Sequence, residues 1–185
     1  MKALFIFLCS ALGSCAIEKP GYEVVTKDGD FEVRKYATIP VVSAPMDDME
    51  KRDGSFRELF RYISGKNEGK QKIAMTSPVF IEDAGVGGKS GKMSFMIPAE
   101  VSAKGAPAPD AEDVAVSSIG EGTFAVLRFK GWDEKKNRDK AGENLARLVS
   151  EAQLKPMGKA FFAFYDPPWT PELFRRNEVW QRIAP

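Results

Sequence analysis

The same order of secondary-structure elements is predicted twice along the chain, and this repetition constrains the fold most. Each half is expected to form a strand, a helix and two further strands, because stretches of alternating apolar residues flank a stretch with apolar residues at helical spacing. The strands of the first half are expected at 31–36 with 39–43, at 72–81 and at 92–97, around a helix at 55–65. Those of the second half are expected at 114–119, 123–130, 159–165 and 177–183, around a helix that begins near Asp133. The repeat predicts a duplicated α+β domain, in which helices cover one side of a curved antiparallel sheet.

Both predicted helices have an apolar face that is expected to pack on the sheet. Ser55, three residues before Glu58, indicates a capping box, and Gly65 ends the first helix. Its apolar face is expected to consist of Phe56, Leu59, Phe60 and Ile63. Asp133 is expected to cap the second helix, whose apolar face consists of Ala141, Leu145, Leu148, Val149 and Ala152. A duplicated domain of this kind has a groove between its halves, and such grooves often bind ligands.

The first 15 residues have the pattern of an export signal. A positive start at Met1-Lys2 precedes an apolar stretch, 3–12, that is too short to span a bilayer. The following Leu-Gly-Ser-Cys, ending at Cys15, resembles a bacterial lipobox. This resemblance implies cleavage before Cys15 and acylation of its thiol, and several acyl chains on one residue hold a protein stably at a membrane.

The expected organisation is therefore a lipoprotein signal peptide at 1–14, a lipidated tether at 15–21 and one domain at 22–185. The protein is expected to be exported and anchored to a membrane, at the outer membrane or the periplasmic face. The alternatives are an ordinary secretory signal with a stray cysteine and a buried N-terminal strand. The lack of cysteine after Cys15 favours the lipoprotein.

Missing residue types exclude several kinds of site. The chain has no histidine, which excludes Ser-His-Asp catalysis, histidine-based zinc sites and a haem with a proximal histidine. Its two cysteines, Cys9 and Cys15, leave the body without a disulfide or a thiolate metal site. The formal net charge of +1 argues against a nucleic-acid partner.

Five sequence blocks, in order from about Tyr22 to Ile183, resemble the SOUL family of haem-binding proteins. The segment 67–79 contains the pattern N…K-I-x-M-T-x-P-V, and 31–36 is similar to the family's opening strand. The segment 92–98 is similar to its K-x-x-F-x-x-P strand, and 129–132 to its F-x-G turn. The stretch 165–179 resembles its closing block, P-x-T-P…R-R-N-E-V.

The resemblance implies an eight-stranded antiparallel, barrel-like sheet flanked by two helices, the fold of bacterial effector-binding domains. It also implies noncovalent binding of haem or another tetrapyrrole in an apolar cleft beside the first helix and the last connecting loop, here 55–65 and 166–176. The axial histidine of some members falls near Pro40. Haem iron would therefore bind methionine or tyrosine, or no strong protein ligand.

Eight residues are candidates for the tetrapyrrole site. A porphyrin offers a flat apolar surface to aromatic rings and two carboxylates to guanidinium groups. Candidates that lie off the apolar face of the first helix, or in the closing loop, are Arg57, Arg61, Tyr62, Trp169, Phe174, Arg175 and Arg176. Met75 is a weak candidate for an axial iron ligand, with a core position as the alternative. Trp169 is equally expected to pack the loop onto the sheet, and Arg175 and Arg176 to form a structural ion-pair cluster with Glu178.

The leading hypothesis is a haem chaperone, buffer or scavenger, monomeric and tethered to a membrane. A binder or sensor of another apolar small molecule, with the effector-binding fold, is the first alternative. A hydrolase that uses carboxylates ranks last, because no spacing singles out a pair among Glu58, Glu82 and Glu178. The protein is therefore expected not to be an enzyme.

Overall fold

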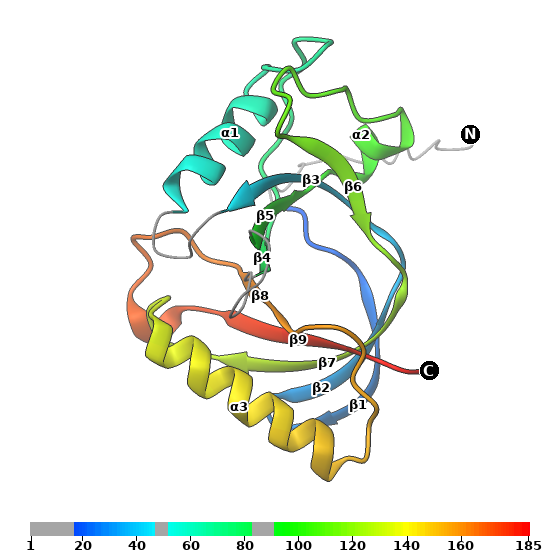
Figure 1. Ribbon diagram of the computed structural model, residues 1–185, viewed down its shortest axis with the longest axis vertical. Coiled ribbons are helices and arrows are strands. Elements are labelled where there is room, and N and C mark those ends of the chain that lie inside the picture. Colours follow the sequence, from blue (N-terminus) through cyan, green and yellow to red (C-terminus); the bar gives the residue numbers. More distant parts are fainter. Residues whose placement is uncertain (1–16, 47–51, 83–90) are drawn as a thin grey trace, which may run out of the picture.

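One antiparallel sheet organises the chain (Figure 1). The computed structural model describes residues 17–46, 52–82 and 91–185. Within these ranges nine strands follow the order β1-β2-β7-β9-β8-β4-β5-β3-β6 across the sheet, which is open. The strands are β1 (Tyr22–Asp28), β2 (Phe31–Tyr36), β3 (Ile39–Met46), β4 (Val79–Glu82), β5 (Gly91–Met96), β6 (Ala115–Ile119), β7 (Gly122–Phe129), β8 (Phe161–Phe164) and β9 (Asn177–Ile183). The helices are α1 (Asp53–Ile63), α2 (Ala99–Ala103) and α3 (Lys135–Glu151), with a 3-10 turn η2 at Glu172–Phe174.

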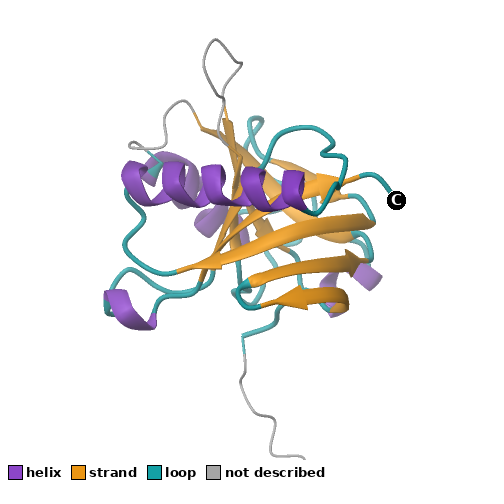
Figure 2. Cartoon of the chain, turned by 90° about the horizontal axis from the view of Figure 1, so that it is seen from below, coloured by secondary structure: helices purple, strands orange, loops and turns teal. Residues whose placement is uncertain are grey.

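The strand order confirms the predicted duplication. The central pair is β8 with β4, and moving outward from it β9 corresponds to β5, β7 to β3 and β2 to β6. Helix α1 packs on β3 and β5, and α3 packs in the equivalent way on β7 and β9. In Figure 2 the long helix α3 lies across one face of the sheet. The fold class is therefore the expected α+β duplication.

The ninth strand is β1, which lies outside the repeat and pairs with β2. Its register shifts between Val24 and Thr26, so the alternation of apolar and polar residues is interrupted. This bulge explains why a search for alternating residues does not find the strand. The strand expected at 72–81 is shorter, because Thr76 donates a hydrogen bond to the Met96 carbonyl and the Ser77 amide to the Glu18 carbonyl, and β4 starts only at Val79.

The hollow of the curved sheet is filled by aromatic and aliphatic side chains, which we call the interior cluster. Its members are Tyr36, Ile39, Val41, Phe80, Met96, Phe124, Val126, Phe161, Ala163 and Trp180. The Trp180 indole stacks on Tyr36, with ring centroids 4.4 Å apart. The inside of the sheet is thus a packed core, and ligand-sized space lies elsewhere.

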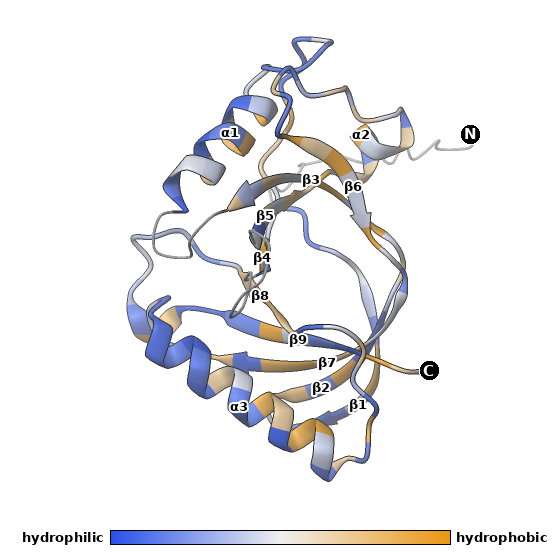
Figure 3. Cartoon of the chain, viewed as in Figure 1, coloured by the Kyte–Doolittle hydropathy of each residue, from blue (hydrophilic) through white to orange (hydrophobic). Residues whose placement is uncertain are grey.

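Helix α3 packs as predicted, whereas α1 is rotated from its expected orientation. Ala141, Leu145 and Val149 of α3 are buried; Leu148 is half-buried, and Ala152 is exposed just after the helix ends. On α1 the buried residues are Leu59, Tyr62 and Ile63. Phe56 and Phe60 are 41% and 52% exposed, so their assignment to the core was wrong. Residues 59, 62 and 63 have the same helical spacing as residues 56, 59 and 60, so spacing alone does not decide which face packs on the sheet. The Tyr62 hydroxyl can turn inward because it donates a partly buried hydrogen bond to the Pro107 carbonyl, at 2.8 Å. Figure 3 shows hydrophilic positions along the outer sides of both helices.

Both predicted N-terminal caps were wrong, whereas Gly65 does follow the end of α1, with a positive φ of 107°. Helix α1 begins at Asp53, and the Ser55 hydroxyl donates to the Pro45 carbonyl at 2.6 Å instead of capping. Helix α3 begins at Lys135, and the Asp133 carboxylate instead accepts hydrogen bonds from Arg52 and Arg138. In the described part of the chain, no helix combines the length and apolar character needed to cross a membrane.

Candidate functional site

A cleft lies where the two halves of the duplication meet, and we call it the inter-half cleft. It has a volume of about 280 Å³. Its apolar floor is formed by Val79 and Ile81 of β4, Met93 of β5 and Phe164 of β8. These strands are neighbours in the sheet, with Val79 opposite Phe164 and Ile81 opposite Met93, so the pairing register itself places the four side chains together. The cleft is thus built at the centre of the duplication.

The rim of the inter-half cleft combines aromatic rings with two arginines and two aspartates, Asp133 and Asp166. Arg52 and Phe56 come from α1 and the residue before it, and Trp132 precedes α3. Arg175, from the closing loop 166–176, lies over the Trp132 ring at 4.2 Å and donates to the carbonyls of Thr170, at 3.0 Å, and Pro168. The rim therefore brings cations and aromatic faces to the edge of an apolar floor.

Arg52 connects the two halves across the rim. Its guanidinium donates to Oδ2 of Asp133, which belongs to the second half, and lies 6.0 Å from the centre of the Phe164 ring. The other carboxylate oxygen of Asp133, Oδ1, accepts from the buried Arg138 at 2.6 Å. The Asp133 carboxylate is thus shared between two arginines.

A buried ionic network lies beside the interior cluster, centred on Glu178 of β9, which is 0% exposed. Arg34 contacts both carboxylate oxygens, at 3.0 and 3.2 Å, and Arg176 donates to Oε1 at 2.7 Å. The Tyr165 hydroxyl and the Trp180 indole nitrogen donate to Oε2 at 2.8 and 2.9 Å. Glu32 joins the network through Arg34, at 2.6 Å. Every oxygen of Glu178 therefore has several donors.

The electrostatics of this network keep Glu178 ionised. Burial raises the pKa of its carboxyl, but the hydrogen bonds and charges of Arg34 and Arg176 outweigh burial, and the pKa lies below its ordinary value. Burial, with the charge of Glu178 second, raises the pKa of the Tyr165 hydroxyl. Glu178 therefore has the character of a structural anion, with its lone pairs already occupied. The predicted ion pair of Arg176 with Glu178 is present, whereas Arg175 belongs to the cleft.

The structure separates the predicted site residues. Arg175 alone of the eight candidates is among the residues that line the inter-half cleft. Arg61 and Tyr62 line a second cavity, of about 430 Å³, between the end of α1 and the segment 109–111. Arg57 is exposed on α1, and neither it nor Met75 lines either of these cavities or the smaller one beside residues 18–21. Met75 is 36% exposed, so the core position considered for it was wrong. Arg176 is held by Glu178.

The aromatic candidates of the closing loop point into solvent. Trp169 and Phe174 are 82% and 77% exposed, and neither is among the residues that line the cleft. The expectation that Trp169 packs the loop onto the sheet was also wrong. Arg175 fixes this loop instead, through its bonds to two carbonyls of the same loop.

Several residues of the cleft were missed by sequence reasoning. Phe56 was assigned to the core, and Arg52 lies just before the expected helix start. Trp132 was visible in the sequence, at the end of the block 129–132, but was not connected with a site. Val79 and Phe164 belong to predicted strands, and the signal that joins them, pairing between β4 and β8, is a long-range one.

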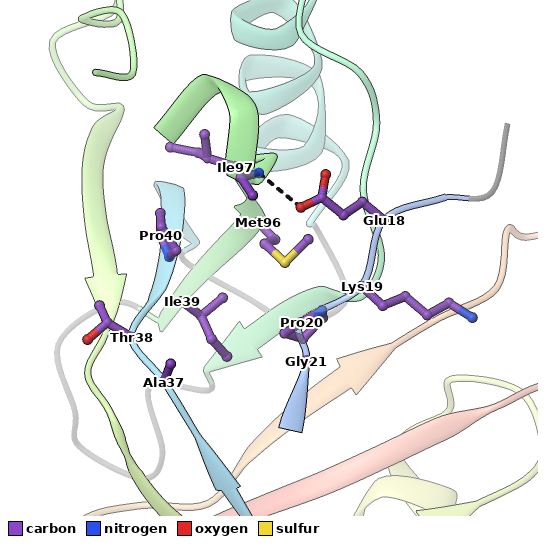
Figure 4. Close-up of a pocket in the computed structure, with 11 residues that line it drawn as sticks. Glu18, Lys19, Pro20, Gly21, Ala37, Thr38, Ile39, Pro40, Met96 and Ile97 are labelled. Atoms are coloured by element: carbon purple, nitrogen blue, oxygen red, sulfur yellow. Dashed lines mark hydrogen bonds between the residues drawn. The ribbon is translucent and has the colours of Figure 1, made fainter. Parts of the chain in front are cut away.

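A third, smaller cavity of about 160 Å³ lies beside residues 18–21 (Figure 4). Pro40 and Met96 line it, and the Glu18 carboxylate accepts a hydrogen bond from the Ala99 amide at 2.9 Å. Met93 and Met96 of β5 line different spaces, Met93 the inter-half cleft and Met96 this cavity. Residues able to hold a metal ion, as a group of three carboxylate or cysteine side chains, are not found together in the described ranges.

Comparison with solved structures shows the fold. The chain resembles EcmrR in an EcmrR–DNA complex, with a TM-score of 0.65 and 11% identity over 83% of this chain and 57% of that chain. It also resembles a hydrolase from Listeria innocua, with a TM-score of 0.58 and 11% identity over 86% of this chain and 94% of that chain. The chain also resembles the isolated EcmrR C-terminal domain, with a TM-score of 0.56, and the match covers 98% of that domain. These similarities confirm the effector-binding-like architecture.

Comparison of sequences shows the family. The chain is 31% identical over 178 residues to heme-binding protein 2 of Homo sapiens, covering 89% of this chain and 85% of that protein. It is 25% identical to heme-binding protein 1 of Xenopus tropicalis, covering 88% of this chain and 85% of that protein. The family model described as SOUL heme-binding protein matches residues 17–182. The chain therefore belongs to the SOUL heme-binding protein family.

Proposed function

We propose that this protein binds haem or a related tetrapyrrole noncovalently in the inter-half cleft. The observation that carries the proposal is a cleft bordered by α1 and the closing loop, with an apolar floor and with two arginines and two aspartates on its rim. Family membership and the relatives named heme-binding protein support the same ligand class.

The residues of the cleft suit the parts of a tetrapyrrole. Val79, Ile81 and Phe164 would offer apolar surface to the ring, and Arg52 and Arg175, on the rim, would be the charged donors to ring carboxylates. The volume, about 280 Å³, is just below the usual range for ligand pockets of about 300–1,000 Å³, so part of the ring would lie over the rim. Met93, a thioether and a weaker iron ligand than histidine, is almost fully buried in the floor, so apolar contact would provide most of the affinity.

We also propose that the protein binds this ligand without transforming it. The buried carboxylate of Glu178 is engaged by two arginines, a tyrosine and a tryptophan, which leaves it poorly suited to act as a general base.

Another apolar small molecule is the alternative ligand, because the floor of the cleft would accept many flat apolar compounds.

Binding is tested by hemin titration of the purified protein and of two matched variants. We expect one hemin per chain, with a shifted Soret band. Phe56→Glu places a charge in the cleft and should weaken binding about tenfold or more, since burying an unpaired charge costs over 1.4 kcal/mol. Phe60→Glu is the control, because Phe60 stacks with Phe56 at 6.2 Å on the same helix, does not line the cleft and is similarly exposed. Equal weakening in both variants, or unsaturable binding, would contradict the proposal.

We propose further that the protein is exported and held at a membrane by a lipid on Cys15, as a haem chaperone, buffer or scavenger. Cys15 lies outside the described residues, and the support is the lipobox-like sequence 12–15. Cells fed an alkyne-labelled fatty acid should incorporate label into the wild type and into Cys9→Ser, and lose it in Cys15→Ser. Retention of label in Cys15→Ser would refute lipidation at this residue.

A further inference from the structure

We infer that Arg52 selects ligands that carry a carboxylate, and that Asp133 holds Arg52 in place until such a ligand displaces it. This inference rests on the proposed function of the inter-half cleft. The Arg52–Asp133 ion pair would then set the charge preference of the site and also act as a barrier to ligand entry.

Arg52 occupies the position that this role requires. It lies on the rim, with its guanidinium 6.0 Å from the ring centre of Phe164, which forms part of the floor. A flat ligand resting on Phe164 would therefore bring a substituent at its edge close to Arg52. Arginine binds carboxylates through two parallel hydrogen bonds, so a carboxylate substituent would gain most from this neighbour.

Asp133 is an internal carboxylate that already pairs with Arg52, through one of its two oxygens. The ion pair joins the two halves of the duplication across the rim, 81 positions apart in the sequence. The Arg52 side chain is one-third exposed, whereas that of Asp133 is nearly buried. The arginine is thus the more exposed member of the pair and the one that an entering ligand would meet first, whereas the aspartate lies behind it.

Arg138, the second partner of Asp133, lowers the free-energy cost of separating Arg52 from Asp133 when a ligand binds. Arg138 donates to Oδ1 at 2.6 Å and to the Asp133 carbonyl at 3.2 Å, whereas Arg52 uses Oδ2. When Arg52 leaves, Asp133 therefore keeps a charged donor and is not left as an isolated buried anion. Breaking a buried pair is costly mainly because it strands a charge, and here that cost is reduced.

The test compares hemin with its dimethyl ester, in which both carboxylates are neutral. Arg52→Gln should weaken hemin binding about tenfold and leave binding of the ester within about twofold, since a charged hydrogen bond contributes about 1.5–3 kcal/mol. Arg57→Gln is the matched control: Arg57 is exposed on the same helix, does not line the cleft, and should change neither affinity.

The role of Asp133 is tested by Asp133→Asn, which keeps an oxygen that can accept from Arg138. This variant should bind hemin about two- to fivefold more tightly than the wild type, the range for a partly exposed ion pair, and the gain should shrink when Arg52→Gln is also present. A thermal melt shows whether the variant folds; if it does not, the comparison of hemin with its ester in Arg52→Gln decides the inference alone.

Failure of the proposed role of Arg52 and failure of haem binding itself give different titration results. Saturable hemin binding in which Arg52→Gln weakens hemin and ester equally, or weakens neither, would overturn the inference and leave the proposed function standing. A wild type that binds neither hemin nor its ester would remove the proposed function, and the inference with it. An equal gain from Asp133→Asn with and without Arg52 would reduce Asp133 to a general repulsive charge, and so would contradict its role as a competitor.

Discussion

Replacing Glu178 with leucine is expected to lower the free energy of unfolding by about 3–5 kcal/mol, as for other buried ion pairs that lose one member. The substitution leaves Arg34, itself buried, with Glu32 as its remaining carboxylate partner. It also removes the acceptor of the Tyr165 hydroxyl and the Trp180 indole nitrogen. Chemical denaturation, followed by circular dichroism, measures the change.

Glu100→Leu is the matched control for this substitution. The Glu100 carboxylate pairs with Lys104, and both side chains are exposed to solvent, so this substitution should change the free energy of unfolding far less than Glu178→Leu. If Glu178→Leu lowers the free energy of unfolding by less than about 1 kcal/mol, the ion pairs around Glu178 are dispensable for stability, contrary to this prediction.

The same network predicts how stability depends on pH. Burial raises the pKa values of both carboxyls, but Lys27 and Arg34 beside Glu32, and Arg34 and Arg176 beside Glu178, bring both below the ordinary value of 4.5 in the folded protein. Their contribution to stability is therefore fully present above about pH 4.5 and is lost as the pH falls through the folded pKa values. Glu178→Gln should flatten the fall in stability below pH 4.5, and an unchanged pH profile would count against a lowered pKa.

Replacing Trp180 with alanine is expected to cost about 3–5 kcal/mol, the usual range for a large aromatic residue removed from a core. Trp180 is fully buried at the centre of the interior cluster, with its ring centre 4.4 Å from that of Tyr36 and 5.5 Å from that of Phe80. The substitution creates a cavity that these rings cannot fill by small shifts, and it removes a donor from Glu178.

Trp169→Ala makes the same chemical change at a residue that is 82% exposed. Its effect on unfolding should stay within about 0.5 kcal/mol, as for other surface substitutions. The difference between the two tryptophan variants, measured by denaturation under the same conditions, isolates burial. Similar losses in both variants would mean that the closing loop packs on the body more tightly than its exposure indicates.

Much of the fold could be predicted from the sequence because its signals are local. The alternation in 31–36 and 177–183 and the helical spacing of Ala141, Leu145 and Val149 each specify an element without reference to distant residues. The repeated order then fixed the architecture. Strand β1 was not predicted, because its bulge breaks the alternation of apolar and polar residues on which strand prediction depends.

The site could be predicted only at the level of its elements. Helix α1 and the closing loop do border the cleft, as the family resemblance implied, but of the candidate side chains only Arg175 lines it. The rotation of α1 could not be read from the sequence, because residues 56, 59, 60 and residues 59, 62, 63 have the same spacing. The pairing of Arg52 with Asp133 joins residues 81 positions apart, and no local pattern records such a contact.

The most direct test of the inter-half cleft as the tetrapyrrole site is methyl NMR with two porphyrins of the same shape. Ferric protoporphyrin is paramagnetic and broadens nearby signals, whereas the gallium(III) complex is diamagnetic and serves as the control. We expect the ferric complex alone to broaden the methyl signals of Val79, Ile81 and Met93. Those of Val33 and Val149, which belong to the core between α3 and the sheet, should stay sharp. Broadening at Val33 and Val149, or at Ile39 and Met96 of the small cavity, with sharp signals from the cleft, would contradict the assignment.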